Sequence, residues 1–172
     1  DLRALGYLGK GIDGDFGQGT ERAVRALQYD LLHHAGGNGA PLTIREYCGG
    51  RVTAVTGVVE SGLAACIDDM INDTAFVKVP SSATPSDDNK RALDAVRAMT
   101  NLAVPKPFLL AVLGQESNWR HFAVPKPANE DNFVTLGLDR NDKANPDHIT
   151  SRGYGMGQYT FSHHPLTVDE MR

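Results

Sequence analysis

Apolar residues recur every three or four positions in four stretches of the chain, and each stretch predicts an amphipathic helix. The stretches lie near residues 20–34, 56–72, 87–103 and 107–116. The periodicity is lost over residues 123–152, where Pro, Asn, Asp and Gly are frequent. Because no stretch has a strong strand signal, we expect a mainly α fold.

A change in composition predicts two domains. Residues 79–87 are rich in Pro, Ser and Asp and read as a linker between a domain over residues 1–78 and a domain over residues 88–172. Near the end, Thr167 and Glu170 have the spacing of a capping box at a helix start. Only two residues follow, so we expect the second domain to be truncated at its C-terminus.

Glu116 is the residue that the helical pattern singles out. Phe108, Val112 and Glu116 are spaced i, i+4, i+8 and therefore share one helix face. A carboxylate among apolar side chains is costly to ionise, so we expect its pKa to be raised. A carboxyl group that stays protonated near neutral pH can serve as a general acid. Glu116 is therefore a candidate catalytic residue.

Composition argues against several classes of partner. Lys and Arg number 17 and Asp and Glu 21, a net charge of −4 that does not favour nucleic acid. No apolar run reaches the roughly 18 residues of a transmembrane segment. The histidines lack zinc-helix spacing and residues 139–150 lack the glycine and glutamate of a calcium loop, so we expect no metal and no cofactor. Cys48 and Cys66 allow one disulfide or two buried thiols.

The first 28 or so residues resemble the small peptidoglycan-binding domains of bacterial and phage cell-wall enzymes. The matching residues are Leu5-Gly6-Tyr7-Leu8, Asp13-Gly14-Asp15-Phe16-Gly17, Thr20, Ala23-Val24 and Leu27-Gln28. Leu27 replaces the usual aromatic residue, and the second Asp-Gly turn of that family is not evident. The resemblance implies a three-helix domain that contacts the wall through Asp13 and Phe16.

The stretch from about 88 to 172 resembles the lysozyme-like superfamily, especially lytic transglycosylases and goose-type lysozymes. The matching elements are Glu116-Ser117 after an apolar helix and Gly155-Met156-Gly157-Gln158. The resemblance implies a helical domain in which Glu116 is the catalytic acid and the glycine element lines a saccharide cleft. The residues expected to bind substrate are Ser117, Tyr154, Met156, Gln158 and Tyr159. Packing against Met156 is the alternative for both tyrosines.

Together these resemblances imply an enzyme that cleaves the β-1,4 glycosidic bonds of peptidoglycan glycan strands. A lytic transglycosylase uses one carboxyl group as acid and then as base toward the sugar's own 6-hydroxyl. A muramidase, as a hydrolase, generally needs a second carboxylate. Candidates for that second group are Asp131, Asp139, Asp142 and Asp147. None has a compelling position, which favours the transglycosylase.

Two other functions are compatible with the same motifs. One is a non-catalytic peptidoglycan-binding or assembly protein that keeps the fold. The other is a toxin or phage component that carries these modules. The chain opens with Asp1-Leu2-Arg3 and shows no signal peptide. A location in the periplasm, the cell envelope or outside the cell is therefore inferred from the resemblance alone.

Overall fold

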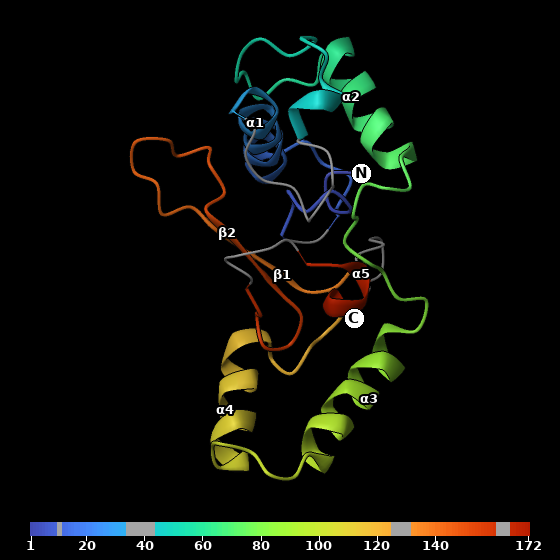
Figure 1. Cartoon of the computed structure of the whole chain (residues 1–172), viewed down its shortest axis with the longest axis vertical. Coiled ribbons are helices and arrows are strands. Elements are labelled where there is room, and N and C mark those ends of the chain that lie inside the picture. Colours follow the sequence, from blue (N-terminus) through green and yellow to red (C-terminus); the bar gives the residue numbers. More distant parts are fainter. Residues whose placement is uncertain (10–11, 34–43, 125–131, 161–165) are drawn as a thin grey trace.

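The computed structural model describes residues 1–9, 12–33, 44–124, 132–160 and 166–172. Over these residues the chain is mainly helical, with one small antiparallel sheet. The elements in chain order are α1 (Gln18–His33), the short 3-10 helix η1 (Ile44–Tyr47), α2 (Ser61–Asn72), α3 (Pro85–Ala98), α4 (Lys106–Ser117), β1 (Leu136–Asp139), β2 (Ser151–Tyr154) and α5 (Val168–Met171). Helices α1 and α2 lie at one end, the sheet and α5 in the middle, and α3 and α4 at the other end (Figure 1).

The first hydrophobic core forms around α1, as the periodicity predicted. Val24, Leu27 and Leu31 are at most 1% exposed and pack with residues from the N-terminal turn, η1 and α2. Cys48 and Cys66 lie in this core as free thiols. Burial raises the pKa of Cys66 to about 11. Of the two alternatives for the cysteines, the structure therefore has the buried thiols.

The loop before α2 contains a turn that was not evident from the sequence. Helix α2 was expected from about residue 56, but it begins at Ser61. Gln28 of α1 accepts hydrogen bonds at Oε1 from the backbone N–H groups of Thr56 (2.9 Å) and Gly57 (2.8 Å). Gly57 has φ 80° and precedes α2 by four positions, as Gly14, with φ 85°, precedes α1. Thr56-Gly57 thus stands before α2 at the same spacing as Asp13-Gly14 before α1.

Strands β1 and β2 form an antiparallel hairpin where no regular structure was predicted. The register pairs Leu136 with Tyr154 and Asp139 with Ser151. Each strand has four residues, too few to show a clear alternation of apolar and polar positions. Both strands contribute to a second hydrophobic core. Its buried residues are Val79, Phe122, Val134, Leu136, Tyr154, Leu166 and Met171.

The capping box predicted near the end of the chain is confirmed. Thr167 Oγ1 accepts a hydrogen bond from Glu170 N (3.3 Å), and Glu170 Oε2 accepts one from Thr167 N (2.8 Å). The short helix α5 follows, and its Met171 is 1% exposed in the second core. The capping box therefore begins a short helix that packs into the second core through Met171.

The stretch predicted to be a linker contacts both parts of the chain. Val79 N donates to Ala4 O (2.7 Å), and Pro80 O accepts from Val134 N (2.9 Å). Helix α3 begins within this stretch, at Pro85, because a first-turn residue needs no N–H donor. The division into two domains stays a prediction, but the joining segment is packed between the parts rather than extended away from them.

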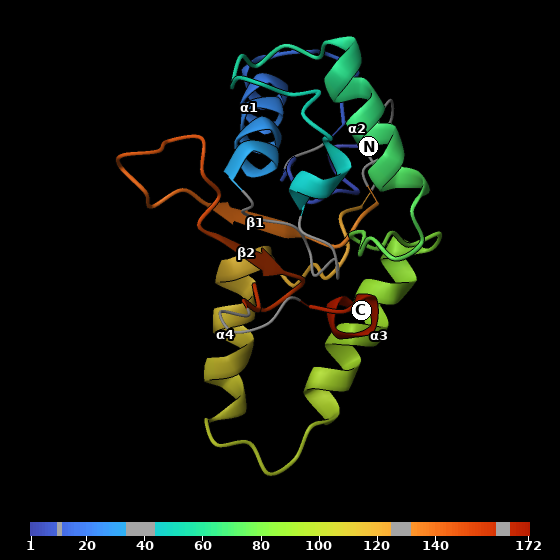
Figure 2. The same ribbon diagram turned by 45° about the horizontal axis from the view of Figure 1, so that its top comes forward.

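Helices α3 and α4 extend beyond the sheet and are joined at their far ends by residues 99–105 (Figures 1 and 2). Leu113 is the one buried residue of α4. The large apolar side chains exposed on this helical hairpin are Met99, Val104, Phe108 and Val112. No helix in the described part of the chain is both long and apolar enough to cross a membrane.

Candidate functional site

The structure brings together the two motifs that the sequence suggested for the site. Ser117, at the end of α4, donates a hydrogen bond through Oγ to the backbone oxygen of Met156 (2.8 Å). The same hydroxyl also lies 3.1 Å from the backbone oxygen of Leu113, one turn earlier. Gly157 packs close to α4 as well, since a Cβ placed there would lie 3.5 Å from Leu113 Cδ2. The end of α4 and the glycine element are therefore in direct contact.

His121 holds the glycine element from its other side, a role that the sequence did not indicate. Its Nδ1 accepts a hydrogen bond from Met156 N (3.2 Å), and its Nε2 lies 3.1 Å from Met171 O. These partners fit a neutral ring that carries its proton on Nε2. Burial lowers the pKa of His121 below its usual value, which favours that neutral form. Gly155 has φ 70°, and a Cβ there would lie 2.4 Å from His121 Cε1, so the contact requires glycine.

Gln158 closes the same turn. Its backbone has φ 49°, and its Nε2 donates to Gly155 O (2.8 Å). Its Oε1 lies over β1, where a Cβ on Gly137 would be only 2.1 Å away. The side chain is half-buried against the sheet. Gln158 therefore shapes the turn, and its expected contact with a saccharide stays a prediction.

The other residues expected to contact substrate differ in exposure. Tyr154 and Met156 are buried, with 7% and 4% of their surface exposed. Burial raises the pKa of Tyr154 to about 12. Tyr154 belongs to the second core, and Met156 is bonded through its backbone to Ser117 and His121, so the expected contact of these two residues with substrate stays a prediction. Tyr159, by contrast, is 58% exposed.

Glu116 lies on the exposed side of α4. The apolar surroundings expected for it are wrong, because Phe108 is 61% and Val112 37% exposed, and Glu116 itself is exposed. The three residues share a face as predicted, but the helix packs through Leu113 and Ser117 instead. Among the described residues, no hydrogen bond or ion pair reaches the Glu116 carboxylate.

The end of α4 is closed by an exposed aromatic residue. Trp119 follows Asn118, and both have positive φ, 57° and 54°. The chain therefore turns back, and Trp119 Nε1 donates to Leu110 O (2.8 Å). The ring covers Gly114, where a Cβ would lie 2.5 Å from Trp119 Cζ2. With 43% of its surface exposed, Trp119 is not the core residue that a lone tryptophan usually is.

None of the described candidates for a second carboxylate is unpaired. Asp139 accepts a hydrogen bond from Ser151, Asp142 from Asn145, and Asp147 from Arg25. These partners lie in or beside the β1–β2 hairpin and on α1, so they hold the carboxylates in the hairpin region. The fourth candidate, Asp131, lies outside the described residues.

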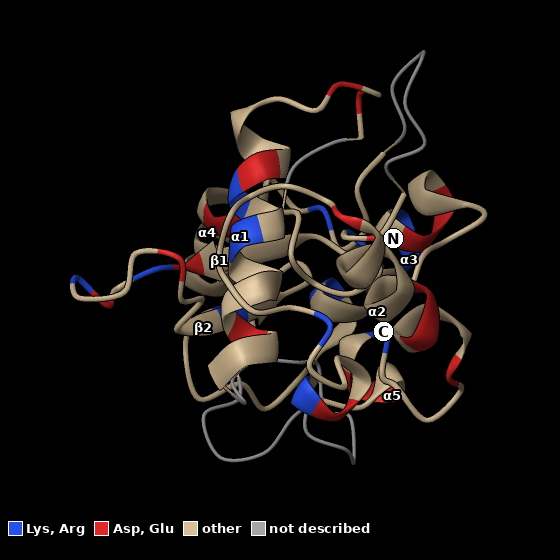
Figure 3. Cartoon of the chain, turned by 90° about the horizontal axis from the view of Figure 1, so that it is seen from above, with Lys and Arg blue, Asp and Glu red and all other residues tan. Residues whose placement is uncertain are grey.

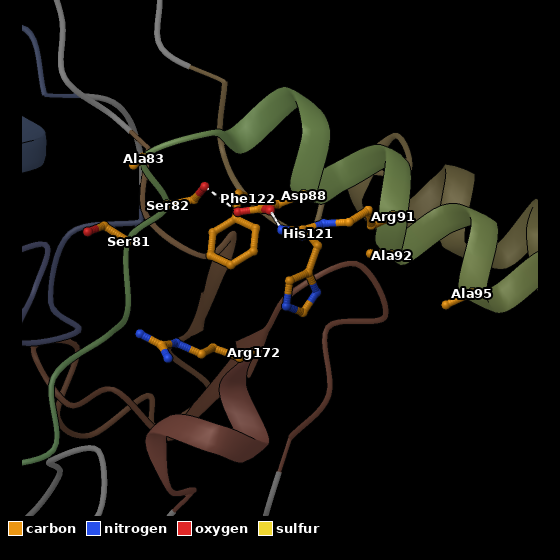
Figure 4. Close-up of a pocket in the computed structure, with 10 residues that line it drawn as sticks. All are labelled: Ser81, Ser82, Ala83, Asp88, Arg91, Ala92, Ala95, His121, Phe122 and Arg172. Atoms are coloured by element: carbon orange, nitrogen blue, oxygen red, sulfur yellow. Dashed lines mark hydrogen bonds and ion pairs between the residues drawn. The ribbon is translucent and has the colours of Figure 1, made fainter.

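A cavity of about 530 Å³ lies beside α3 (Figure 4). Asp88, Arg91 and His121 are among the residues that line it. Ser82 Oγ donates to Asp88 Oδ2 (2.5 Å) and Arg91 pairs with the same carboxylate, so both contacts lower the pKa of Asp88. Glu116 does not line this cavity, in which Asp88 pairs with Arg91 and His121 bonds to the glycine element.

The expected wall contacts Asp13 and Phe16 lie on an exposed turn before α1. Asp13 Oδ1 accepts a hydrogen bond from Asp15 N (3.0 Å), and Thr20 Oγ1 donates to Asp15 O (3.2 Å). The ring of Phe16 is 59% exposed. An ordered turn thus presents an aromatic surface, and its contact with the wall stays a prediction.

Charged residues of both signs are distributed over the described surface. In the view from above, Lys and Arg are interspersed with Asp and Glu (Figure 3). Some of them pair with each other, as Arg51 does with Asp69 and Lys90 with Asp94. Within the described part of the chain, no three His, Cys, Asp or Glu side chains gather as a metal site requires.

Comparison with known proteins identifies one family in one part of the chain. The sequence model described as "Putative peptidoglycan binding domain" matches residues 1–31. No curated protein and no solved structure gives a significant match. The match covers the N-terminal turn, the turn that carries Phe16, and most of α1. Residues 1–31 are therefore similar to a peptidoglycan-binding domain, which suggests peptidoglycan as partner and the cell envelope as location.

Proposed function

We propose that the protein is a peptidoglycan-cleaving glycosidase, a lytic transglycosylase or a muramidase, that holds its substrate through an N-terminal wall-binding module. The observation that supports this most is the hydrogen bond from Ser117 Oγ to Met156 O. It joins the Glu-Ser pair to the glycine element across 39 positions of sequence. The lysozyme-like resemblance rests on the same two segments, and the contact between them is what that resemblance requires.

In the proposed reaction Glu116 protonates the glycosidic oxygen as the bond to the sugar's anomeric carbon breaks. In the transglycosylase version the same carboxylate then accepts the proton of the sugar's 6-hydroxyl, which forms a 1,6-anhydro ring. In the muramidase version a water molecule takes the place of that hydroxyl. Ser117 and His121 are positioning residues, since they hold the glycine element against α4. Tyr159 and Trp119 offer exposed aromatic faces near the ends of these two segments.

The wall-binding module adds to this function by proximity. Holding the second part of the chain at an insoluble substrate raises its effective concentration there. The contact between Asp30 of α1 and Arg152 of β2 joins the module to the sheet, so substrate bound by the module would stay close to the second part of the chain.

The test compares Glu116→Gln with wild type in the clearing of purified sacculi. Glutamine keeps the shape of the side chain but cannot transfer the proton, so we expect the rate to fall by about 100-fold or more. Glu46→Gln, which alters another exposed glutamate, is the matched control and should clear normally. Equal rates for wild type and Glu116→Gln would remove Glu116 from the mechanism. Mass spectrometry of the products separates the two reactions, because anhydro ends indicate a transglycosylase and reducing ends a muramidase.

One observation favours a second candidate function, a non-catalytic wall-binding or assembly protein. The Glu116 carboxylate is exposed and has no described partner to orient it. This candidate predicts that wild-type protein sediments with sacculi and releases no soluble fragments. Release of fragments that stops in Glu116→Gln would exclude it.

A further inference from the structure

A second cavity, of about 350 Å³, lies where the N-terminal module meets the sheet. One side is formed by residues 7–9 and by Gly19 and Arg22 of the first turns of α1, and the other by residues 136–138 and Arg140. A Cβ placed on Gly19 would meet no atom within 4 Å, so this side is open. No residue of α4 or of the glycine element lines this cavity, although Gly137, which does, lies beside Gln158 of that element.

The charge around this cavity is unbalanced. Arg22 and Arg140 line it, and burial together with the charges of Arg22 and Arg152 lowers the pKa of Arg140. Among the described residues, no hydrogen bond or ion pair reaches the guanidinium group of Arg22 or Arg140. Arg140 is half-buried, so the repulsion that it experiences from Arg22 is unfavourable unless an anion joins the two guanidinium groups.

The carboxylates near this cavity are bonded to other groups. Asp147 binds both Nε and Nη2 of Arg25 (2.9 and 2.8 Å), although it also attracts Arg140 at longer range. Asp30 accepts hydrogen bonds from Tyr7 and Arg152. The protein therefore supplies no bonded counter-charge to the two cavity-lining arginines from its described residues.

We propose that this cavity binds the carboxylate or phosphate group of a ligand between Arg22 and Arg140. A guanidinium group offers a planar pair of donors that matches either oxyanion. The N-terminal end of α1 adds partial positive charge on the same side. Peptidoglycan as the source of the anion rests on the proposed function, through the free carboxylates of its peptides. The anion site itself does not depend on that function.

The experiment measures the thermal midpoint of the full chain at constant ionic strength, with chloride replaced stepwise by inorganic phosphate or acetate. We expect a saturable rise for wild type, because a ligand that binds only the folded state stabilises it. In Arg22→Gln and Arg140→Gln the apparent affinity should fall by at least about tenfold. Lys143→Gln removes one charge from an exposed position outside the cavity and should retain the wild-type response.

A readout without phosphate or acetate separates oxyanion binding from a structural role. In chloride, Arg140→Gln should keep or raise the midpoint, because a repulsion is removed. If Arg140→Gln has a lower thermal midpoint in chloride and wild type does not respond to phosphate or acetate, Arg140 has a structural role and the proposal is overturned. The same anion response in wild type and both arginine variants would also overturn it.

The source of the anion is then tested with N-acetyl-D-alanine, its neutral amide and glycerol 3-phosphate. Stabilisation by the first alone indicates a peptide carboxylate, and stabilisation by the last alone indicates a phosphate. Equal stabilisation by the amide would contradict recognition of the anion. Sacculus clearing by Glu116→Gln is independent of these measurements, so failure of the enzyme proposal and failure of the anion site are distinguishable.

Discussion

Replacing Asp30 by asparagine should greatly destabilise the protein, because Asp30 joins α1 to the sheet through a buried ion pair. Its side chain is fully buried, and its Oδ2 lies 3.3 Å from Nη2 of Arg152, whose side chain is 8% exposed. Tyr7 Oη donates to the same oxygen (2.7 Å). Asparagine keeps the shape of Asp30 but leaves the Arg152 cation without its counter-charge.

The expected loss can be worked from these contacts. Removing one partner of a buried ion pair typically costs about 3–5 kcal/mol. The lower end applies here, because Arg152 Nε still donates to Gly6 O (3.0 Å) and the Tyr7 ring lies 4.9 Å from its guanidinium carbon. A loss of about 3 kcal/mol lowers the urea midpoint by about 1.5 M for a slope of about 2 kcal/mol per molar. Equilibrium unfolding of the full chain in urea measures it.

A matched control is available in a second ion pair between α1 and the hairpin. Arg25 and Asp147 form two hydrogen bonds, but their side chains are 33% and 21% exposed. Water screens this pair, so Asp147→Asn should cost about 1 kcal/mol or less. If Asp30→Asn costs no more than Asp147→Asn, the buried pair does not hold the module to the sheet and the reasoning is refuted.

A double variant tests the same reasoning from the other direction. Burial raises the pKa of Asp30 against the opposing attraction of Arg152, and Asp30 Oδ1 has no hydrogen-bond partner. The cost of removing Asp30 from water therefore cancels much of the free energy of unfolding that the Asp30–Arg152 pair contributes. Asp30→Leu combined with Arg152→Met should be more stable than Asp30→Asn alone, since no charge is left buried and unpaired. A double variant less stable than the single one would contradict this.

Three further predictions concern the glycine element and the first core. Burial lowers the pKa of His121 below 6.5, so as pH falls the unfolded state binds a proton before the native state does. The free energy of unfolding should therefore fall as pH drops below about 6.5. Urea unfolding at pH 5 and 7 measures this dependence, which His121→Phe should flatten. Cys48 and Cys66 should resist a thiol reagent in the native protein near pH 8 and both react in urea, whereas fewer than two reactive thiols in urea would indicate a disulfide. Gly155→Ala should destabilise the protein by about 2 kcal/mol or more, because Gly155 has φ 70° and a Cβ there would lie 2.4 Å from His121. Gly157→Ala should cost much less, because its Cβ would meet Leu113 at 3.5 Å. Thermal unfolding of both variants measures the difference.

Local patterns predicted that α1 to α4 exist and placed α1 and α4 to within two residues, although the start of α2 was misplaced by five. Val24, Leu27 and Leu31 are spaced along one face of α1 and are all buried. Thr167 and Glu170 form the capping box that their spacing predicted. These signals succeed because each depends on residues within one or two turns of each other.

Other features depend on distant parts of the chain and escaped local reasoning. The β1–β2 hairpin pairs Leu136 with Tyr154, and strands of four residues have too little alternation to be recognised. The backbone at Gly57, in the loop before α2, is held by Gln28 of α1, whose Oε1 accepts the Gly57 N–H. Both features depend on contacts between segments far apart in sequence, so the residues next to each segment do not predict them.

The sequence by itself determined the mainly helical character of the chain, the turn-and-helix unit that matches peptidoglycan-binding domains, and the identity of Glu116 and Ser117 as a motif. Only the tertiary structure decided which face of α4 is covered, so Phe108, Val112 and Glu116 share a face as predicted but lie exposed. It also decided that Ser117 meets Met156 and that Asp30 meets Arg152. The physical reason is that helical periodicity reports which residues share a face, whereas the partner of that face depends on contacts between segments far apart in sequence.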